Sequence, residues 1–279
     1  MKRLLFSVTT LCCLISCSGN KEAAEDRYDQ ASSLYNKGEF NLAKREIDSI
    51  KTLYPKEFDV LRKSIRLMRQ IEMKEQERNF QYCDSMLTEM TVKSEQLKKE
   101  FIFQQDKEYD KIGRYIHKSL DLDRNINHNY LRAEVFENGT LQLISVYNGT
   151  RALKHNMIRV SMKDGSFAET SAIPFDGGRN YRFKDGDMNH ERVTFNLQND
   201  GGVTNFISQF KDQPITLLFI GDQKEATQLL PVQKNAISTS LELSATLQAM
   251  QTLVEDKRLA EAKLNILKKK EAEVKADNK

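Results

Sequence analysis

The 279-residue chain contains no tryptophan, only four prolines and four cysteines, and little excess charge of either sign. Its 43 Lys and Arg residues against 40 Asp and Glu residues give a formal net charge of +3. Two of these positive charges, Lys2 and Arg3, lie in a segment that we expect to be removed, which leaves about +1. Nucleic-acid binding needs a concentrated positive surface, so the composition predicts no nucleic acid partner.

Long apolar runs are also lacking except at the N-terminus, and a mean hydropathy of -0.61 excludes a multi-span membrane protein. The cationic start Met1-Lys2-Arg3 precedes an apolar stretch over 4–15, which is the layout of a secretory signal peptide. A membrane-spanning helix needs roughly 20 apolar residues, so this stretch is too short to be one.

The apolar stretch ends in Leu14-Ile15-Ser16-Cys17. These residues resemble the lipobox of bacterial lipoproteins, in which a small residue precedes a cysteine that is acylated on sulfur and becomes the new N-terminus. The resemblance implies a signal peptide over 1–16, lipid attachment at Cys17, a polar tether through residue 27, and export to the bacterial cell envelope with the membrane as one partner. A plain cleaved signal peptide, with Cys17 incidental, is the alternative.

Few cysteines remain after export. Cys12 and Cys13 leave with the signal peptide and Cys17 is lipidated, so only Cys83 is left and no intramolecular disulfide is expected. Cys83 lies in an apolar series with helical period, where a cysteine behaves as a small buried hydrophobe.

Asp48-Ser49-Ile50 and Asp84-Ser85-Met86 resemble the acceptor sequence for O-linked sugars in exported Bacteroidetes proteins. A chance match of three residues is the alternative.

Glycine is absent from residues 39–112, and apolar residues recur there at threes and fours, which predicts a helical region over 28–126. Ten positions fit one tetratricopeptide repeat: Tyr28, Ala31, Leu34, Tyr35, Gly38, Phe40, Ala43, Ile47, Ile50 and Pro55. The resemblance implies an antiparallel helical hairpin over 28–55. A second copy is missing, because Glu72 stands where the turn glycine would recur, and such repeats usually need neighbours. We therefore expect two long helices after the hairpin to cover it, with Phe101 and Tyr109 continuing the second.

Nine of the twelve glycines fall between Gly139 and Gly221, where the apolar period also changes to two. Alternating runs flank Asn138-Gly139 and a second pair flanks Asp164-Gly165, which predicts two hairpins. Further strands are predicted over 180–183, 192–197 and 214–221, with a short helix from Val203. The whole indicates an antiparallel β domain of six or seven strands over 127–232.

Neither glycine nor proline occurs from residue 235 to the end, and an apolar stripe with a phase slip near Lys257 predicts one long helix over 235–279. No sheet signal remains for it to pack on, so we expect its apolar face to lie against the N-terminal helices. The predicted fold is α+β, with helical hairpins and a long C-terminal helix flanking an antiparallel β domain.

Catalytic motifs are scarce. The chain has no H-E-x-x-H, G-x-S-x-G, glycine-rich phosphate loop or C-x-x-C, and we predict no cofactor. The four histidines, His117, His128, His155 and His190, lack zinc-site spacing and are expected at the surface, with His117 on a helix.

The best metal candidate is the loop with Asp185, Asp187 and Asn189, whose oxygens stand at positions one, three and five of a calcium-loop pattern. His190 and Asn196 stand where that pattern wants glycine and glutamate. An acidic hairpin turn is the favoured interpretation.

Two functional hypotheses follow. The first is a lipid-anchored envelope protein that acts as a binding or scaffolding module without catalysis, with another envelope protein or polymer as its partner. The second is an exported hydrolase-like enzyme on cell-wall or glycan substrates. Its polar cleft would be formed by Tyr147, Phe175, Asp176, Tyr181, Asp185, Asp187 and Glu191. A homo-oligomeric coiled coil is a third option, against which the phase slip near Lys257 argues; the oligomeric state stays open.

Overall fold

The computed structural model describes residues 18–120 and 128–277 and has an α+β fold. The predicted signal peptide and the predicted lipidation site Cys17 lie outside the described residues. The chain divides into two compact units, one made of residues up to 84 together with those from 256, and one made of residues 85–255.

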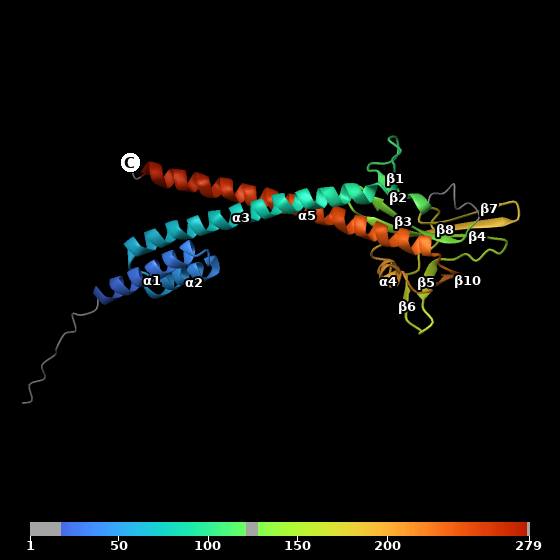
Figure 1. The fold of residues 1–279 in the computed structure, drawn as a ribbon, viewed down its shortest axis with the longest axis horizontal. Coiled ribbons are helices and arrows are strands. Elements are labelled where there is room, and N and C mark those ends of the chain that lie inside the picture. Colours follow the sequence, from blue (N-terminus) through green and yellow to red (C-terminus); the bar gives the residue numbers. More distant parts are fainter. Residues whose placement is uncertain (1–17, 121–127, 278–279) are drawn as a thin grey trace, which may run out of the picture. The chain divides into compact units, whose positions relative to one another are not determined.

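The first unit begins with the helical hairpin of α1 (Ser18–Asn36) and α2 (Phe40–Leu53), visible in blue in Figure 1. Gly38 makes the turn with φ of +78°, and the small Ala31 and Ala43 are fully buried where the helices meet. Leu67 and Ile71 of α3 (Phe58–Lys98) join the same core. The hairpin and its cover by the next helix are therefore present, but α1 already begins at Ser18 and buries Ala24. The expected start of the hairpin at residue 28 and the polar tether through residue 27 are wrong.

Helix α3 is one helix of 41 residues, so the expectation of two separate helices is wrong. The helical prediction is also wrong beyond it, because Phe101–Gln104 and Arg114–His117 form the antiparallel strands β1 and β2, followed by a short 3₁₀ helix, η1 (Lys118–Leu120). His117 therefore lies on a strand. Pairing of β2 with β3 buries Ile116, a tertiary gain that overrides the local periodicity.

The second unit contains two antiparallel sheets. The six-stranded sheet has the order β1-β2-β3-β4-β8-β7, and the four-stranded sheet has the order β10-β9-β5-β6. The remaining elements are β3 (Tyr130–Phe136), β4 (Leu141–Gly149), β5 (Met157–Ser161), β6 (Phe167–Glu169), β7 (Asn180–Asp185), β8 (Met188–Asn196), α4 (Val203–Gln209), β9 (Thr216–Ile220) and β10 (Lys224–Gln228). Both predicted hairpins and the short helix are present, with eight strands over 130–228 in place of six or seven.

One core fills the second unit between the sheets. Leu143, Phe195, Ile158 and Phe219 from the two sheets, together with Ile207 of α4, belong to a single buried cluster. This face of the six-stranded sheet is called the inner face below, and the opposite one the outer face. The alternation of strand side chains decides which residue belongs to which face.

The C-terminal helix α5 (Pro231–Asp277) starts four residues before the predicted boundary. Its first turns belong to the β unit, because Ala236 and Ile237 lie in the main core, and Leu243 packs with Val135 and Leu141. The expectation that its whole apolar stripe lies against the N-terminal helices is therefore wrong for this part. Beyond residue 255 it does contact α3, where Lys257 pairs with Asp84 at 2.5 Å.

Close approach of α5 to the β3–β4 turn requires Gly139, whose φ is +75°. Its carbonyl oxygen accepts hydrogen bonds from Ser244 Oγ at 2.6 Å and from Gln248 Nε2 at 2.8 Å. A Cβ placed at residue 139 would lie 2.9 Å from the backbone nitrogen of Gln248. Backbone cannot move aside as a flexible side chain does, so the turn tolerates no side chain.

We predict that Gly139→Ala destabilises the β unit by about 2–4 kcal/mol, from left-handed strain plus the clash with α5. Gly177→Ala is the matched control, because Gly177 has φ of +73° with open space around it, and should cost only about 1 kcal/mol. Thermal unfolding followed by circular dichroism measures both. Equal losses in the two variants would contradict the close packing of α5.

Candidate functional site

The predicted calcium ligands lie at the tip of the β7–β8 hairpin. Asp185 pairs with Met188 across a turn in which Gly186 has φ of +55°. The amide of Asn189 donates to the carbonyl oxygen of Thr150 at 3.0 Å. Within residues 18–120 and 128–277, no group of three or more His, Cys, Asp and Glu side chains could hold a metal ion. The geometry is that of a hairpin turn.

The residues of the predicted enzyme cleft do not come together. Tyr147 and Glu191 are buried on the inner face, whereas Phe175 and Tyr181 are exposed. Asp176 instead accepts hydrogen bonds from the amides of its own turn, and these bonds, from Asn180 first and then Gly178, lower its carboxyl pKa. The set is split between core and surface, which a shared cleft does not allow.

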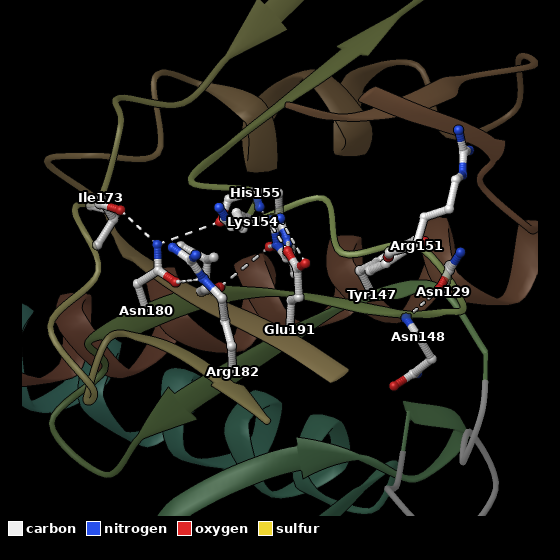
Figure 2. A network of polar contacts seen from close by, with 12 residues as sticks. Asn129, Tyr147, Asn148, Arg151, Lys154, His155, Ile173, Asn180, Arg182 and Glu191 are labelled. Carbon is white, nitrogen blue, oxygen red and sulfur yellow. Dashed lines mark hydrogen bonds and ion pairs between the residues drawn. The ribbon is translucent and has the colours of Figure 1, made fainter. Parts of the chain in front are cut away.

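A buried polar network on the inner face is the first feature that the sequence did not reveal (Figure 2). His155 lies in the segment between β4 and β5 and has zero exposure, so its expected surface position is wrong. Its Nδ1 lies 2.8 Å from Glu191 Oε2 and its Nε2 lies 2.8 Å from Ser145 Oγ. The β4–β8 register places Ser145 opposite Val193 and Tyr147 opposite Glu191, which puts Ser145 and Glu191 on one face.

These contacts have the connectivity of a serine nucleophile, a histidine base and an orienting carboxylate. Ser145 also has zero exposure, however, and the His155 ring packs edge-on against Tyr147 and Phe219 within the core. A hydroxyl that no substrate reaches cannot attack one. We therefore interpret the trio as a structural network that satisfies polar groups where the chain crosses between the sheets.

Glu191 holds this crossing in place. It accepts backbone hydrogen bonds from Lys154 and His155, each at 2.7 Å, besides the contact with the ring. Desolvation raises the pKa of Glu191, but the hydrogen bonds from the His155 ring and the two amides outweigh it, so the pKa lies below the ordinary value of 4.5. Asn180 extends the network by donating to the carbonyl oxygen of Ile173 at 2.8 Å.

A second network lies on the outer face and consists of four charged side chains, Arg114 of β2, Arg132 and Glu134 of β3, and Arg192 of β8. Arg132 donates a hydrogen bond to Glu134, and both side chains are buried. Arg114 Nε and Arg192 Nη2 each lie 3.6 Å from a Glu134 carboxylate oxygen, close enough for an ion pair but too far for a hydrogen bond. We call these four residues the arginine cluster.

Three buried nitrogen atoms of the arginine cluster have no hydrogen-bond partner among the described residues, namely Nε and Nη1 of Arg132 and Nε of Arg114. Each buried donor without an acceptor lowers the stability of the fold by about 1–3 kcal/mol. Unsatisfied donors in a native structure therefore need an explanation. Sequence reasoning missed the cluster because its members lie on three strands. The alternation of Arg132 and Glu134 was visible, but their partners are known only from the register.

Aromatic side chains continue the outer face toward the β7 edge. Tyr181 lies opposite Arg192, and Phe183 lies opposite His190, in the β7–β8 register. The Phe183 and His190 rings are stacked, with 4.6 Å between their centroids and 10° between their planes. Tyr181 and Phe183 nevertheless remain 45% and 49% exposed. We call Tyr181, Phe183 and His190 the aromatic strip.

Comparison of the chain with protein-family models, with curated proteins and with solved structures gives no match. Over the described part of the chain, no helix has the length and apolar character needed to cross a membrane.

We predict that Glu191→Gln destabilises the β unit by about 2–4 kcal/mol at pH 7, because three buried contacts lose their charged acceptor. The folded-state pKa of Glu191 is lowered, so its contribution is present above about pH 4.5 and is lost as the pH falls through the folded value. Urea unfolding at several pH values should show that the variant loses less stability on acidification than the wild type.

Glu225→Gln provides the control, because Glu225 is a more exposed glutamate whose ion pair with Arg151 lies at the surface. It should change stability by about 0–1 kcal/mol. Parallel pH profiles for Glu191→Gln and the wild type would show that Glu191 does not act through its charge.

Proposed function

We propose that the protein is a lipid-anchored component of the bacterial cell envelope that acts as a binding or scaffolding module. The anchor rests on the cationic start, the short apolar stretch and Leu14-Ile15-Ser16-Cys17. One acyl chain alone binds a membrane reversibly, whereas several chains on one cysteine hold permanently. Another envelope protein or polymer is the proposed partner.

The observation that carries the binding role is the aromatic strip beside the arginine cluster on the outer face. Tyr181 and Phe183 expose large rigid rings, and Arg192 lies directly opposite Tyr181 in the register. Tyr and Arg are the residue types most enriched at the energetic centres of interfaces, because they bring large contact area and directional donors.

An exported enzyme is the less favoured candidate. The Ser145, His155 and Glu191 contacts are the arrangement closest to catalytic chemistry, and all three side chains are buried in the core. The carboxylates expected in the cleft serve turns or that core. These observations support a role in binding over one in hydrolysis.

We predict that Cys17→Ser moves the protein from the membrane fraction to the soluble envelope fraction, because the acylated sulfur is its attachment point. Cell fractionation with immunoblotting measures the change, and mass spectrometry of the wild-type N-terminal peptide should show acylated Cys17. Cys83→Ser is the control, since the Cys83 side chain is buried and should not affect the anchor. Recovery of the wild-type chain from the cytosol with Met1 attached would contradict the anchor.

A photoreactive benzoylphenylalanine at position 181 should form a discrete crosslinked adduct in intact cells, because the aromatic strip contacts the partner directly. Mass spectrometry identifies what is joined. The same probe at Phe167 is the control, since this exposed aromatic lies on β6 of the four-stranded sheet. An adduct at both positions, or at neither, would refute the outer face as the binding surface.

A further inference from the structure

The arginine cluster carries more positive charge than its own carboxylate neutralises. Among the described residues, the ion pairs of Arg114, Arg132 and Arg192 all end on the single carboxylate of Glu134. Three positive groups minus one negative group leave an excess of two positive charges at one place on the outer face. Charge of one sign in a partly desolvated place attracts a counter-ion.

Burial makes this excess unusual. The Arg132 side chain is 4% exposed, and it is held by its hydrogen bond to Glu134. Within residues 18–120 and 128–277, its Nε and Nη1 atoms have no hydrogen-bond partner, although an arginine cannot lose its proton to avoid the cost of burial. Two donor nitrogens of a fixed planar group therefore lie where the described part of the chain supplies no acceptor.

We propose that Arg114, Arg132 and Arg192 form a binding site for an oxyanion, a phosphate or carboxylate group carried by the partner of the outer face. The unpartnered donors of Arg132 bind its oxygens, and Arg192 and Arg114 close around it. Glu134 orients Arg132 and sets the depth at which the anion stops. Guanidinium groups suit this task because their planar fork matches two oxygens of a phosphate or carboxylate at once.

Access to the site depends on the two outer arginines. The side chains of Arg114 and Arg192 are 33% and 42% exposed, so each can change rotamer without disturbing the core. Desolvation lowers the pKa of Arg192, Arg132 and Arg114 lower it further, and Glu134 and Tyr130 oppose them. This pattern marks a cation short of negative neighbours, which is the condition that an arriving anion relieves.

This inference deepens the proposed function by naming the chemistry of the ligand, and it rests on that function only in placing the anion on an envelope partner. Anion binding is measured on the purified full chain in nonionic detergent, without any partner. Crosslinking at position 181 tests the proposed binding surface, and anion titration tests the anion site. A negative result in one experiment therefore does not imply a negative result in the other.

The test is titration of the ¹⁵N-labelled full chain with inorganic phosphate and, separately, with acetate, up to about 50 mM at constant ionic strength set with chloride. The arginine side-chain Nε–H signals are followed by NMR, and the Arg132→Lys spectrum assigns the Arg132 signal. We expect saturable shifts of Arg132 with at least one of the two anions. Saturation by phosphate alone or by acetate alone distinguishes the two ligand chemistries.

Two variants remove different parts of the site. Arg132→Lys keeps the charge but loses the free donors, and Arg192→Gln changes a partly exposed residue that leaves the Arg132–Glu134 pair intact. Each should weaken anion binding about tenfold, the effect of one lost charged contact. Arg159→Gln is the control, because Arg159 is equally exposed at 42% but pairs with Glu169 on the other sheet; it should bind as the wild type does.

The proposal is overturned if neither anion gives saturable shifts in the wild type, or if the Arg192→Gln and Arg159→Gln variants bind equally well. It is also overturned by a crystal structure grown in phosphate and acetate that places only water on Nε and Nη1 of Arg132. Circular dichroism of each variant confirms folding, and Arg192→Gln keeps the test decisive if Arg132→Lys fails to fold.

Discussion

Pairing of β4 with β3 on one side and β8 on the other determines which side chains share a face of the six-stranded sheet. Because side chains alternate along a strand, shifting the register of one strand by one residue would move its core side chains to the opposite face of the sheet. Leu143 and Phe195, opposite each other in this register, commit the inner face to the core. The positions of Glu191 on one face and Arg192 on the other follow from that single constraint.

The two polar networks of the six-stranded sheet differ in how fully they satisfy the hydrogen-bonding groups of a buried charge. Glu191 receives hydrogen bonds from two amides and lies against the His155 ring, which stabilises its ionised form. Arg132 is as deeply buried, but two of its donor nitrogens have no acceptor in the parts of the chain that the structure describes. The complete network stabilises the fold, and the incomplete one is the place where we propose that a ligand supplies the missing acceptors.

Binding in this protein is therefore proposed to combine two kinds of contact on neighbouring strands. The aromatic strip provides apolar area, and the arginine cluster provides charge with direction. In an interface of this composition, the buried centre provides most of the affinity, and the charged groups provide specificity for the partner. The helical hairpin of the first unit presents no comparable set of unsatisfied donors among its described residues.

Local sequence signals were sufficient for the elements whose reasons are local. Gly38 and the small Ala31 and Ala43 indicated the helical hairpin, Asn138-Gly139 indicated the β3–β4 turn, and the lack of glycine and proline after residue 235 indicated α5. Strands β1 and β2 escaped prediction because their apolar spacing suits a helix, and they are strands only because β1 pairs with β2 and β2 pairs with β3. The His155 network and the arginine cluster were decided by tertiary structure alone, since register joins residues that lie tens of positions apart, a relation to which no local pattern in the chain corresponds.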